Sequence, residues 1–272
     1  MLFAHISDLH FRSDGRKLYD FIDTNTANAE VINRINSLTE KPDAVIITGD
    51  ITNCGLENEY KVAKRILGHL QYPILIVPGN HDNKSFFLKA FQPLCPLLGD
   101  NPQQIAYKVD HDEAQLLFID STEPGTHAGQ LSDYTLQWLD NALDQSNKPS
   151  YLFMHHPPVA LGNLQMDRIG CQNGHELLKL IDKYPHLIRI FCGHVHRTMF
   201  TQYKQTIIAS APGTVHQVPY SSSDPTDLYC LEPAAMLMHR LVPKTGLVTY
   251  SQPLTQISGP YRYESAISCP GD

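Results

Sequence analysis

Five short, mostly apolar runs that each end in Asp, Asn or His constrain the fold of this chain more than any other feature. Such runs are typical of buried strands in a parallel sheet. Segments with helical spacing of apolar residues separate most of them, and this alternation of strand and helix predicts an α/β fold. The expected strands are residues 3–7, 43–48, 74–77, 151–154 and 187–192, and the expected helices are residues 24–38, 57–70, 84–91, 132–144 and 174–183.

The strand expected at residues 74–77 shows how these runs end. Pro78 and Gly79 break the strand, so that Asn80, His81 and Asp82 leave its carboxyl end. Ligands bind at that end of the strands in open α/β sheets. The same stretch is also typical of an ordinary turn in which Asn80 or Asp82 caps the next helix, and alone it leaves both interpretations open.

The other strand ends carry side chains of the same chemical kind. Residues i and i+2 of an extended chain point to the same side, so Asp8 can converge with His10, and His194 with His196. Asp50 follows a glycine, which lets the backbone come close to a bound group. The sequence His-His-Pro-Pro at 155–158 stiffens the chain, and this fixes one of two imidazoles at a strand end.

One divalent ion cannot use all of these side chains, but two ions that share a carboxylate can. Asp50 is the natural bridge, because the two oxygens of a carboxylate can span ions about 3.5–4 Å apart. Nitrogen and oxygen ligands without thiolate favour iron, manganese, zinc or cobalt over calcium. The candidate metal ligands are Asp8, His10, Asp50, Asn80, His155 or His156, His194 and His196.

Composition argues against several classes of partner. The formal net charge of −7 and the isoelectric point near 6.0 disfavour binding to a nucleic-acid polymer or to an anionic membrane surface. No apolar run approaches the roughly 20 residues of a membrane span. The N-terminal Met-Leu-Phe-Ala lacks the basic flank of a signal peptide, so we expect a cytoplasmic protein.

The six cysteines form no Cys-x-x-Cys pair, which favours reduced thiols over a disulfide framework or a zinc finger. Cys54 and Cys269 lie in loop-like surroundings, and the sequence leaves open a single bridge at these positions, within one chain or between two.

The C-terminal part of the sequence behaves differently from the rest. From about residue 217 the strand–helix alternation stops, and a Ser/Asp/Pro loop at 221–226 precedes hairpin-like stretches at 234–242 and 247–254. We therefore expect a catalytic domain at residues 1–215 and a small β-rich cap at residues 216–272. The cap is also a candidate oligomerisation arm, so we expect a homo-oligomer.

The polar strand ends together resemble the signature blocks of the calcineurin-like metallophosphoesterases. Within that superfamily the chain is most similar to bacterial glycerophosphodiesterases related to class III cyclic-nucleotide phosphodiesterases, along nearly its whole length. The resemblance implies the metallophosphoesterase fold, a four-layer α/β sandwich flanked by helices. The blocks, in chain order, are Asp8-x-His10, Gly49-Asp50-x-x-Asn53, Gly79-Asn80-His81-Asp82, His155-His156 and Gly193-His194-x-His196.

The resemblance also implies a division of the ligands between two metal ions. Asp8, His10, Asp50 and His196 would hold one ion, and Asp50, Asn80, His155 and His194 would hold the other. This leaves His156 a structural role and leaves Asp82 to cap the helix that follows it. Two dications against two carboxylates leave a surplus of about two positive charges, which suits a phosphodiester anion.

The implied enzyme is a dinuclear metal-dependent phosphodiesterase of broad phosphodiester specificity, which hydrolyses glycerophosphodiesters by attack of a metal-bridging hydroxide. Asp50, Asn80 and His81 would be catalytic, and Asn53, His81 and His216 would contact the small-molecule substrate. His81 would either donate a proton to the leaving group or only orient its neighbours. The alternatives are a 3′,5′-cyclic nucleotide phosphodiesterase, a phosphomonoesterase and an inactive scaffold of the same fold.

Overall fold

Two β-sheets form the centre of the molecule. The computed structural model describes residues 1–220, 228–255 and 258. The first sheet has the strand order β11-β10-β1-β2-β3 and the second has the order β4-β5-β6-β7-β9-β8. The strands are β1 (Leu2–Ile6), β2 (Ala44–Thr48), β3 (Ile74–Val77), β4 (Ala106–Asp110), β5 (Gln115–Ile119), β6 (Ser150–Phe153), β7 (Leu187–Cys192), β8 (Met199–Tyr203), β9 (Thr206–Ser210), β10 (Ala235–Val242) and β11 (Gly246–Pro253).

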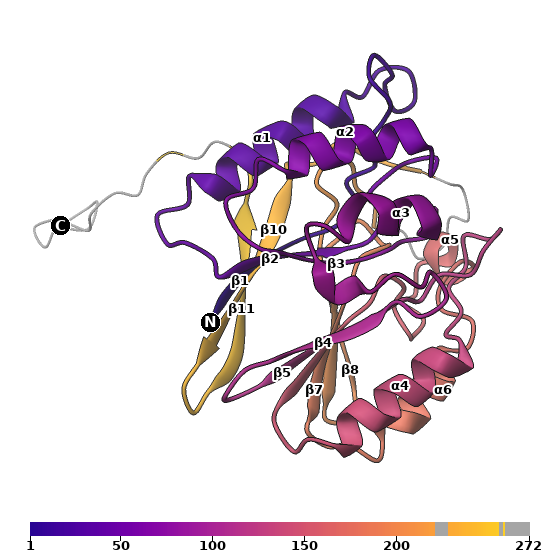
Figure 1. The fold of residues 1–272 in the computed structure, drawn as a ribbon, viewed down its shortest axis with the longest axis vertical. Helices are drawn as coiled ribbons and strands as arrows, with labels where there is room; N and C mark the ends of the chain where they lie inside the picture. The colour runs from indigo at the N-terminus through magenta and orange to yellow at the C-terminus, as the bar shows by residue number, and fades with distance from the viewer. Residues whose placement is uncertain (221–227, 256–257, 259–272) are drawn as a thin grey trace, which may run out of the picture.

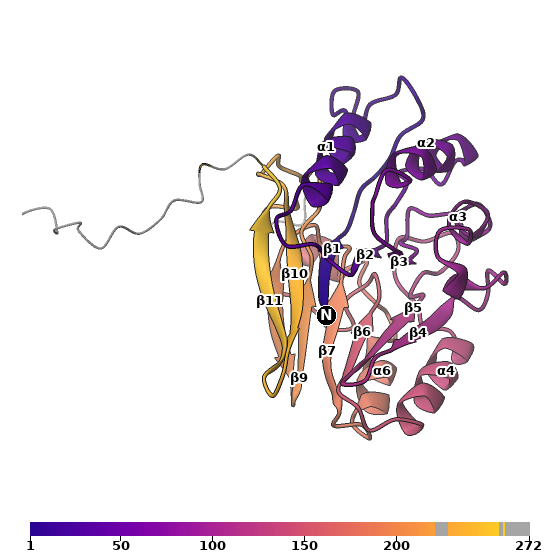
Figure 2. The same ribbon diagram turned by 60° about the vertical axis from the view of Figure 1, so that its left-hand side comes forward.

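Helices cover the outer faces of both sheets. Figures 1 and 2 show α1, α2 and α3 beside the first sheet, and α4 and α6 beside the second. This arrangement confirms the α/β class and the layered sandwich expected from the sequence. The helices are α1 (Thr24–Asn36), α2 (Glu57–Leu67), α3 (Lys84–Phe91), α4 (Asp133–Asp144), α5 (Leu164–Asp167) and α6 (Gly174–Ile181), with a short 3₁₀ turn η1 (Pro96–Leu98).

Side chains from the two faces of the second sheet pack into two separate cores. Leu116 and Phe118 of β5 belong to the larger core, which also contains the apolar side chains of the first sheet. Their neighbours Leu117 and Ile119 belong to the core under α4 and α6. A strand sends successive side chains to opposite faces, so one run of apolar residues can serve both cores.

Aromatic rings from three neighbouring strands stack in the larger core. The centroids of Phe118 and Phe153 are 5.0 Å apart, and those of Phe153 and Phe191 are 5.1 Å apart. Offset stacking of this kind adds to the free energy gained by burial. It also holds β5, β6 and β7 in register behind the site described below.

The C-terminal hairpin β10–β11 belongs to the first sheet. Strand β10 pairs antiparallel with β1, with Leu2 opposite Arg240 and His5 opposite Leu237. On its other side β1 pairs parallel with β2, so the N-terminal strand is internal to the sheet. Within the described part of the chain, no helix is long and apolar enough to cross a membrane.

Candidate metal centre

Strands from both sheets end at one place, where their backbones nearly touch. His155, after β6, donates its Nδ1 hydrogen to the carbonyl of Thr48 in β2 at 2.7 Å. The amide of His194, after β7, donates to Asp8 Oδ1 at 3.1 Å. Gly193 makes this approach possible, because a Cβ there would lie 2.0 Å from Ser7 Oγ.

Five of the predicted ligands stand on a left-handed backbone. Their φ angles lie between 49° and 70°, a region that residues other than glycine seldom occupy. Such conformations persist only where the surrounding structure enforces them, and they cluster at functional sites. These residues are Asp8, His10, Asp50, His194 and His196.

Four side chains form a first cluster of possible metal ligands. Asp8, His10, Asp50 and His196 each place one ligand atom within 4.8 Å of the others. His196 donates its Nδ1 hydrogen to the carbonyl of His216 at 3.0 Å, so its Nε2 carries a lone pair that faces His10 Nε2 at 3.2 Å. Asp8 Oδ2 is buried without a hydrogen-bond partner. A cation bound here would satisfy both atoms.

A second group of side chains meets on the other side of Asp50. Because His155 uses its Nδ1 hydrogen on Thr48, its Nε2 is left to bind a proton or a metal, and it faces Asn80 Oδ1 at 3.0 Å and Asp50 Oδ1 at 3.4 Å. His194 Nδ1 also lies 3.0 Å from Asn80 Oδ1. Three acceptors that face one another need a shared proton or a cation. The donor set therefore fits a metal ion here as well, with Asp50 common to both groups.

Burial and neighbouring charges shift the pKa values of the side chains in both groups. Burial raises the pKa of Asp8 to about 7. Burial opposes protonation of His155, but the neighbouring Asp50 carboxylate outweighs it and raises the pKa of His155 to about 9. Burial lowers the pKa of His10 and of His194 well below the ordinary value, which keeps both imidazoles neutral and able to coordinate.

The two adjacent histidines after β6 differ in what they contact. Both nitrogens of His156 have other partners: Nδ1 lies 2.9 Å from Ser121 Oγ, and Nε2 lies 3.2 Å from the carbonyl of His127. His155, in contrast, points Nε2 at Asp50 and Asn80. These contacts favour His155 as a ligand, and His156 supports the loop after β5, although ligand atoms of His155, His156 and His194 lie within 4.8 Å of one another.

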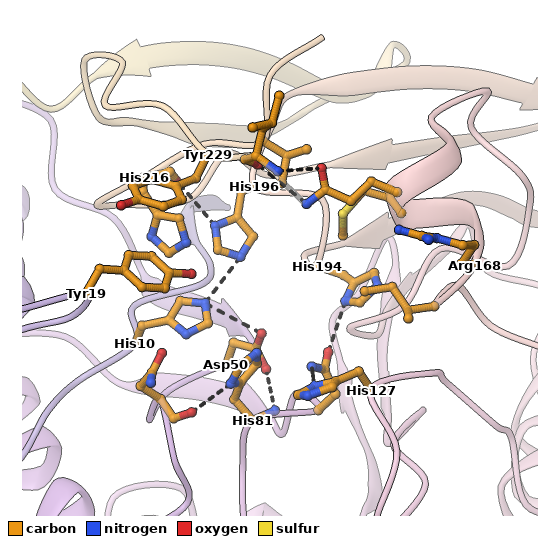
Figure 3. Close-up of a pocket in the computed structure, with 17 residues that line it drawn as sticks. His10, Tyr19, Asp50, His81, His127, Arg168, His194, His196, His216 and Tyr229 are labelled. Carbon is orange, nitrogen blue, oxygen red and sulfur yellow. Dashed lines mark hydrogen bonds and ion pairs between the residues drawn. The ribbon is translucent and has the colours of Figure 1, made fainter. Parts of the chain in front are cut away.

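His81 lies at the edge of the centre with one nitrogen open to the pocket. Its Nδ1 hydrogen goes to the carbonyl of Asn53 at 2.7 Å, and its amide donates to Asp50 Oδ1 at 2.9 Å. The ring packs edge-on against His10, with 4.8 Å between centroids. These two hydrogen bonds leave Nε2 unused, and His81 lines the pocket shown in Figure 3.

The prediction that Asp82 caps the helix after it is wrong. Asn83 caps α3, because its side chain accepts hydrogen bonds from the first amides of that helix. Asp82 instead accepts from the amides of Ile51, Thr52 and Gly79, and from the hydroxyl of Tyr60. It thereby ties the loop after β2 to the loop after β3, a role that its position beside a helix start does not reveal.

A pocket of about 560 Å³ opens above the two groups of ligands (Figure 3). Asn53 and His216, the predicted substrate contacts, both line it. Sequence reasoning missed the aromatic pair at its rim: Tyr19 and Tyr229 stack with 4.4 Å between centroids, from segments 210 residues apart in the chain. His127 lines the pocket too, and it accepts a hydrogen bond from the Asn80 amide at 3.0 Å.

Cys54, one of the two cysteines considered for a bridge, is exposed and free in the structure. The other, Cys269, lies outside the described residues.

Comparison with known proteins identifies the family. Residues 1–198 match the family described as calcineurin-like phosphoesterase. The chain belongs to this family. It is 52% identical to the glycerophosphodiester phosphodiesterase GpdQ of Enterobacter lignolyticus, over 100% of this chain and 98% of that protein. It is 30% identical to the 3′,5′-cyclic adenosine monophosphate phosphodiesterase CpdA of Pseudomonas aeruginosa, over 82% of this chain and 80% of that protein.

The fold of the calcineurin-like phosphoesterases also recurs among solved structures. A dimetal phosphatase from Danio rerio superimposes with a TM-score of 0.67, covering 94% of this chain and 99% of that one. The two sequences are only 14% identical, so this similarity concerns the fold alone.

Proposed function

We propose that this chain is a metal-dependent phosphodiesterase that hydrolyses glycerophosphodiesters. The observation that carries the proposal is the position of Asp50, whose two carboxylate oxygens face separate groups of ligands. Oδ2 lies 3.6 Å from His10 Nε2, and Oδ1 lies 3.4 Å from His155 Nε2. The 52% identity to a glycerophosphodiester phosphodiesterase over the full chain supports the choice of substrate class.

The proposal assigns the ligands to two divalent ions: iron, manganese, zinc or cobalt. When bound, such ions lower the pKa of water and stabilise charge on the phosphoryl oxygens. One ion takes Asp8, His10, Asp50 and His196, and the other takes Asp50, Asn80, His155 and His194. The carbonyls of Thr48 and His216 support this assignment, because they orient His155 and His196 with Nε2 towards the other candidate ligands of each set.

His81 has the position of a proton donor in this proposal. Hydrolysis forms a bond from phosphorus to a water oxygen and breaks the bond to the alcohol oxygen, which must gain a proton as it leaves. The Nε2 of His81 is the nitrogen able to deliver it, since Nδ1 is committed to Asn53. His216 and Asn53 would contact the ester substituents from the pocket walls.

A substrate panel run with metal-quantified protein tests the function. We expect turnover of glycerophosphoethanolamine that disappears on chelation and returns with added manganese, zinc, cobalt or iron. Activity that survives complete removal of metal would contradict the dinuclear site. Absence of turnover by fully loaded protein would favour an inactive scaffold, for which the complete set of candidate ligands gives no support.

A cyclic nucleotide phosphodiesterase is the second candidate, because the chain is 30% identical to a 3′,5′-cyclic adenosine monophosphate phosphodiesterase. Turnover of cyclic AMP faster than that of glycerophosphoethanolamine would select it. A phosphomonoester added to the same panel gives the turnover of the third possible substrate class relative to the other two.

We also propose a cytoplasmic homo-oligomer that binds neither nucleic-acid polymers nor membranes. The division into a catalytic domain at 1–215 and a cap at 216–272 is part of this proposal. Sedimentation as a strict monomer would contradict the self-association.

A further inference from the structure

A second cavity lies beside the pocket of Figure 3 and shares a wall with it. Its volume is about 420 Å³, and Asn80 and His81 line both cavities. These two residues therefore form a ridge between the cavities, next to the place where the phosphate of a substrate would sit. We call the larger cavity lobe 1 and the smaller one lobe 2.

The two lobes differ in chemistry. Six apolar or aromatic side chains line lobe 1, among them Met166, Ile169 and Tyr229. Lobe 2 is lined instead by small or polar residues, and prolines are its only aliphatic side chains within the described residues. Polar walls suit a group that carries several hydroxyls, whereas apolar walls tolerate substituents of varied shape.

Lobe 2 has a fixed wall and unpaired polar groups. Lys84 pairs with Asp120 and donates to the carbonyl of Thr122 at 3.1 Å, so it holds the loop after β5 against α3. Gln103 and Glu123 stand exposed on two loops that line the lobe. Among the described residues, neither of these two side chains has a protein hydrogen-bond partner, so both are available to hydroxyl groups.

We propose that the two lobes hold the two ester arms of the substrate separately: the glyceryl arm in lobe 2, and the variable alcohol in lobe 1. This inference rests on the proposed function. A phosphodiester has two substituents on one phosphorus, and a ridge formed by Asn80 and His81 places one lobe on each side of that atom. Gln103 and Glu123 are then specificity-determining residues for the glyceryl arm, and the mixed walls of lobe 1 would accept alcohols of varied shape.

A pair of tryptophan substitutions on one loop tests the assignment. Gln103→Trp places a bulky side chain in lobe 2, and Gln104→Trp is its matched control, since Gln104 is also exposed but lines neither lobe. Glu123→Trp fills lobe 2 from another loop and serves if Gln103→Trp folds poorly. Thermal unfolding and metal content establish that each variant is folded and loaded.

Three probe substrates separate the arms: glycerophosphoethanolamine, methyl phosphoethanolamine and glyceryl methyl phosphate. We expect Gln103→Trp to lose kcat/KM on the order of tenfold or more for both glyceryl esters, relative to Gln104→Trp, and clearly less for the ester without glycerol. Equal values for the two variants would overturn the proposal, as would a loss that follows the ethanolamine arm. Wild-type protein that hydrolyses none of the three would overturn the proposed function as well.

Discussion

Replacement of Gly193 by alanine tests whether close approach of the two sheets builds the metal centre. Gly193 follows β7 and faces β1 and β2 of the other sheet. A Cβ there would lie 2.0 Å from Ser7 Oγ and 2.6 Å from the carbonyl oxygen of Thr48. That carbonyl orients His155, and the next residue in the chain, His194, is a candidate ligand. The substitution therefore pushes ligand-bearing strand ends apart.

The geometry sets the size of the expected effect. The Ser7 hydroxyl can rotate away, but the Thr48 carbonyl is backbone. Its contact of 2.6 Å is about 0.8 Å shorter than an ordinary contact of 3.4 Å, so the strand ends must separate by a distance of that order. Overpacking of a tight site costs about 1–3 kcal/mol of stability. Misplacement of reacting groups by about 1 Å lowers the rate on the order of 10²-fold. We expect a folded protein whose activity falls far more than its stability.

The assay is kcat/KM for glycerophosphoethanolamine, with metal content and thermal unfolding measured on the same samples. Gly170→Ala is the matched control, because a Cβ at Gly170 would meet its nearest atoms at 3.7 Å. The control should match wild type in all three measurements. A Gly193→Ala protein with wild-type activity and metal content would refute the claim that this close approach builds the site.

Three further predictions concern the centre itself. Calorimetric titration should show two unequal affinities, since one ion has the neutral Asn80 amide in place of a carboxylate; equal affinities would contradict this. His81→Ala should lose on the order of 10²–10⁴-fold on alkyl esters and less on p-nitrophenyl esters, and an equal loss on both would exclude the acid role. Metal binding at pH 7 should release protons, because the metal-free pKa values of Asp8 and His155 are about 7 and about 9 and ions displace those protons. The affinity for metal should therefore fall as the pH drops. Calorimetry in buffers of different ionisation enthalpy measures the proton release, and the absence of any release would contradict this prediction.

The sequence predicts the strand ends well because their signals are local. An apolar run followed by glycine or proline marks both the strand and the point where it stops, as at Val77, Pro78 and Gly79. Parallel strands then bring their carboxyl ends to the same edge of the sheet, whatever the order of the strands in it. Asp8 and His10 do converge as expected, but not for the expected reason, because both lie on a left-handed backbone beyond the end of β1 and not on an extended strand.

Features that depend on contacts between distant segments escaped prediction. Asp82 was expected to cap a helix because it stands just before one, yet its hydrogen bonds go to Ile51, Thr52 and Tyr60, which no local pattern connects with it. Tyr19 and Tyr229 stack at the rim of the pocket, but they lie on two loops that no sequence pattern connects. The pairing of β10 with β1 likewise follows from the fold and not from either strand.

That last pairing has a consequence for how the protein is made. Leu2 leaves the ribosome long before its antiparallel partner, Arg240, has been synthesised. At a synthesis rate of about 5–20 residues per second, the side of β1 that pairs with β10 stays unpaired for roughly 10–50 seconds. During that time it presents unpaired backbone groups, which are a template for wrong pairing. The segment with β1, β2 and β3 can collapse during synthesis, but its sheet is complete only once the β10–β11 hairpin has been synthesised.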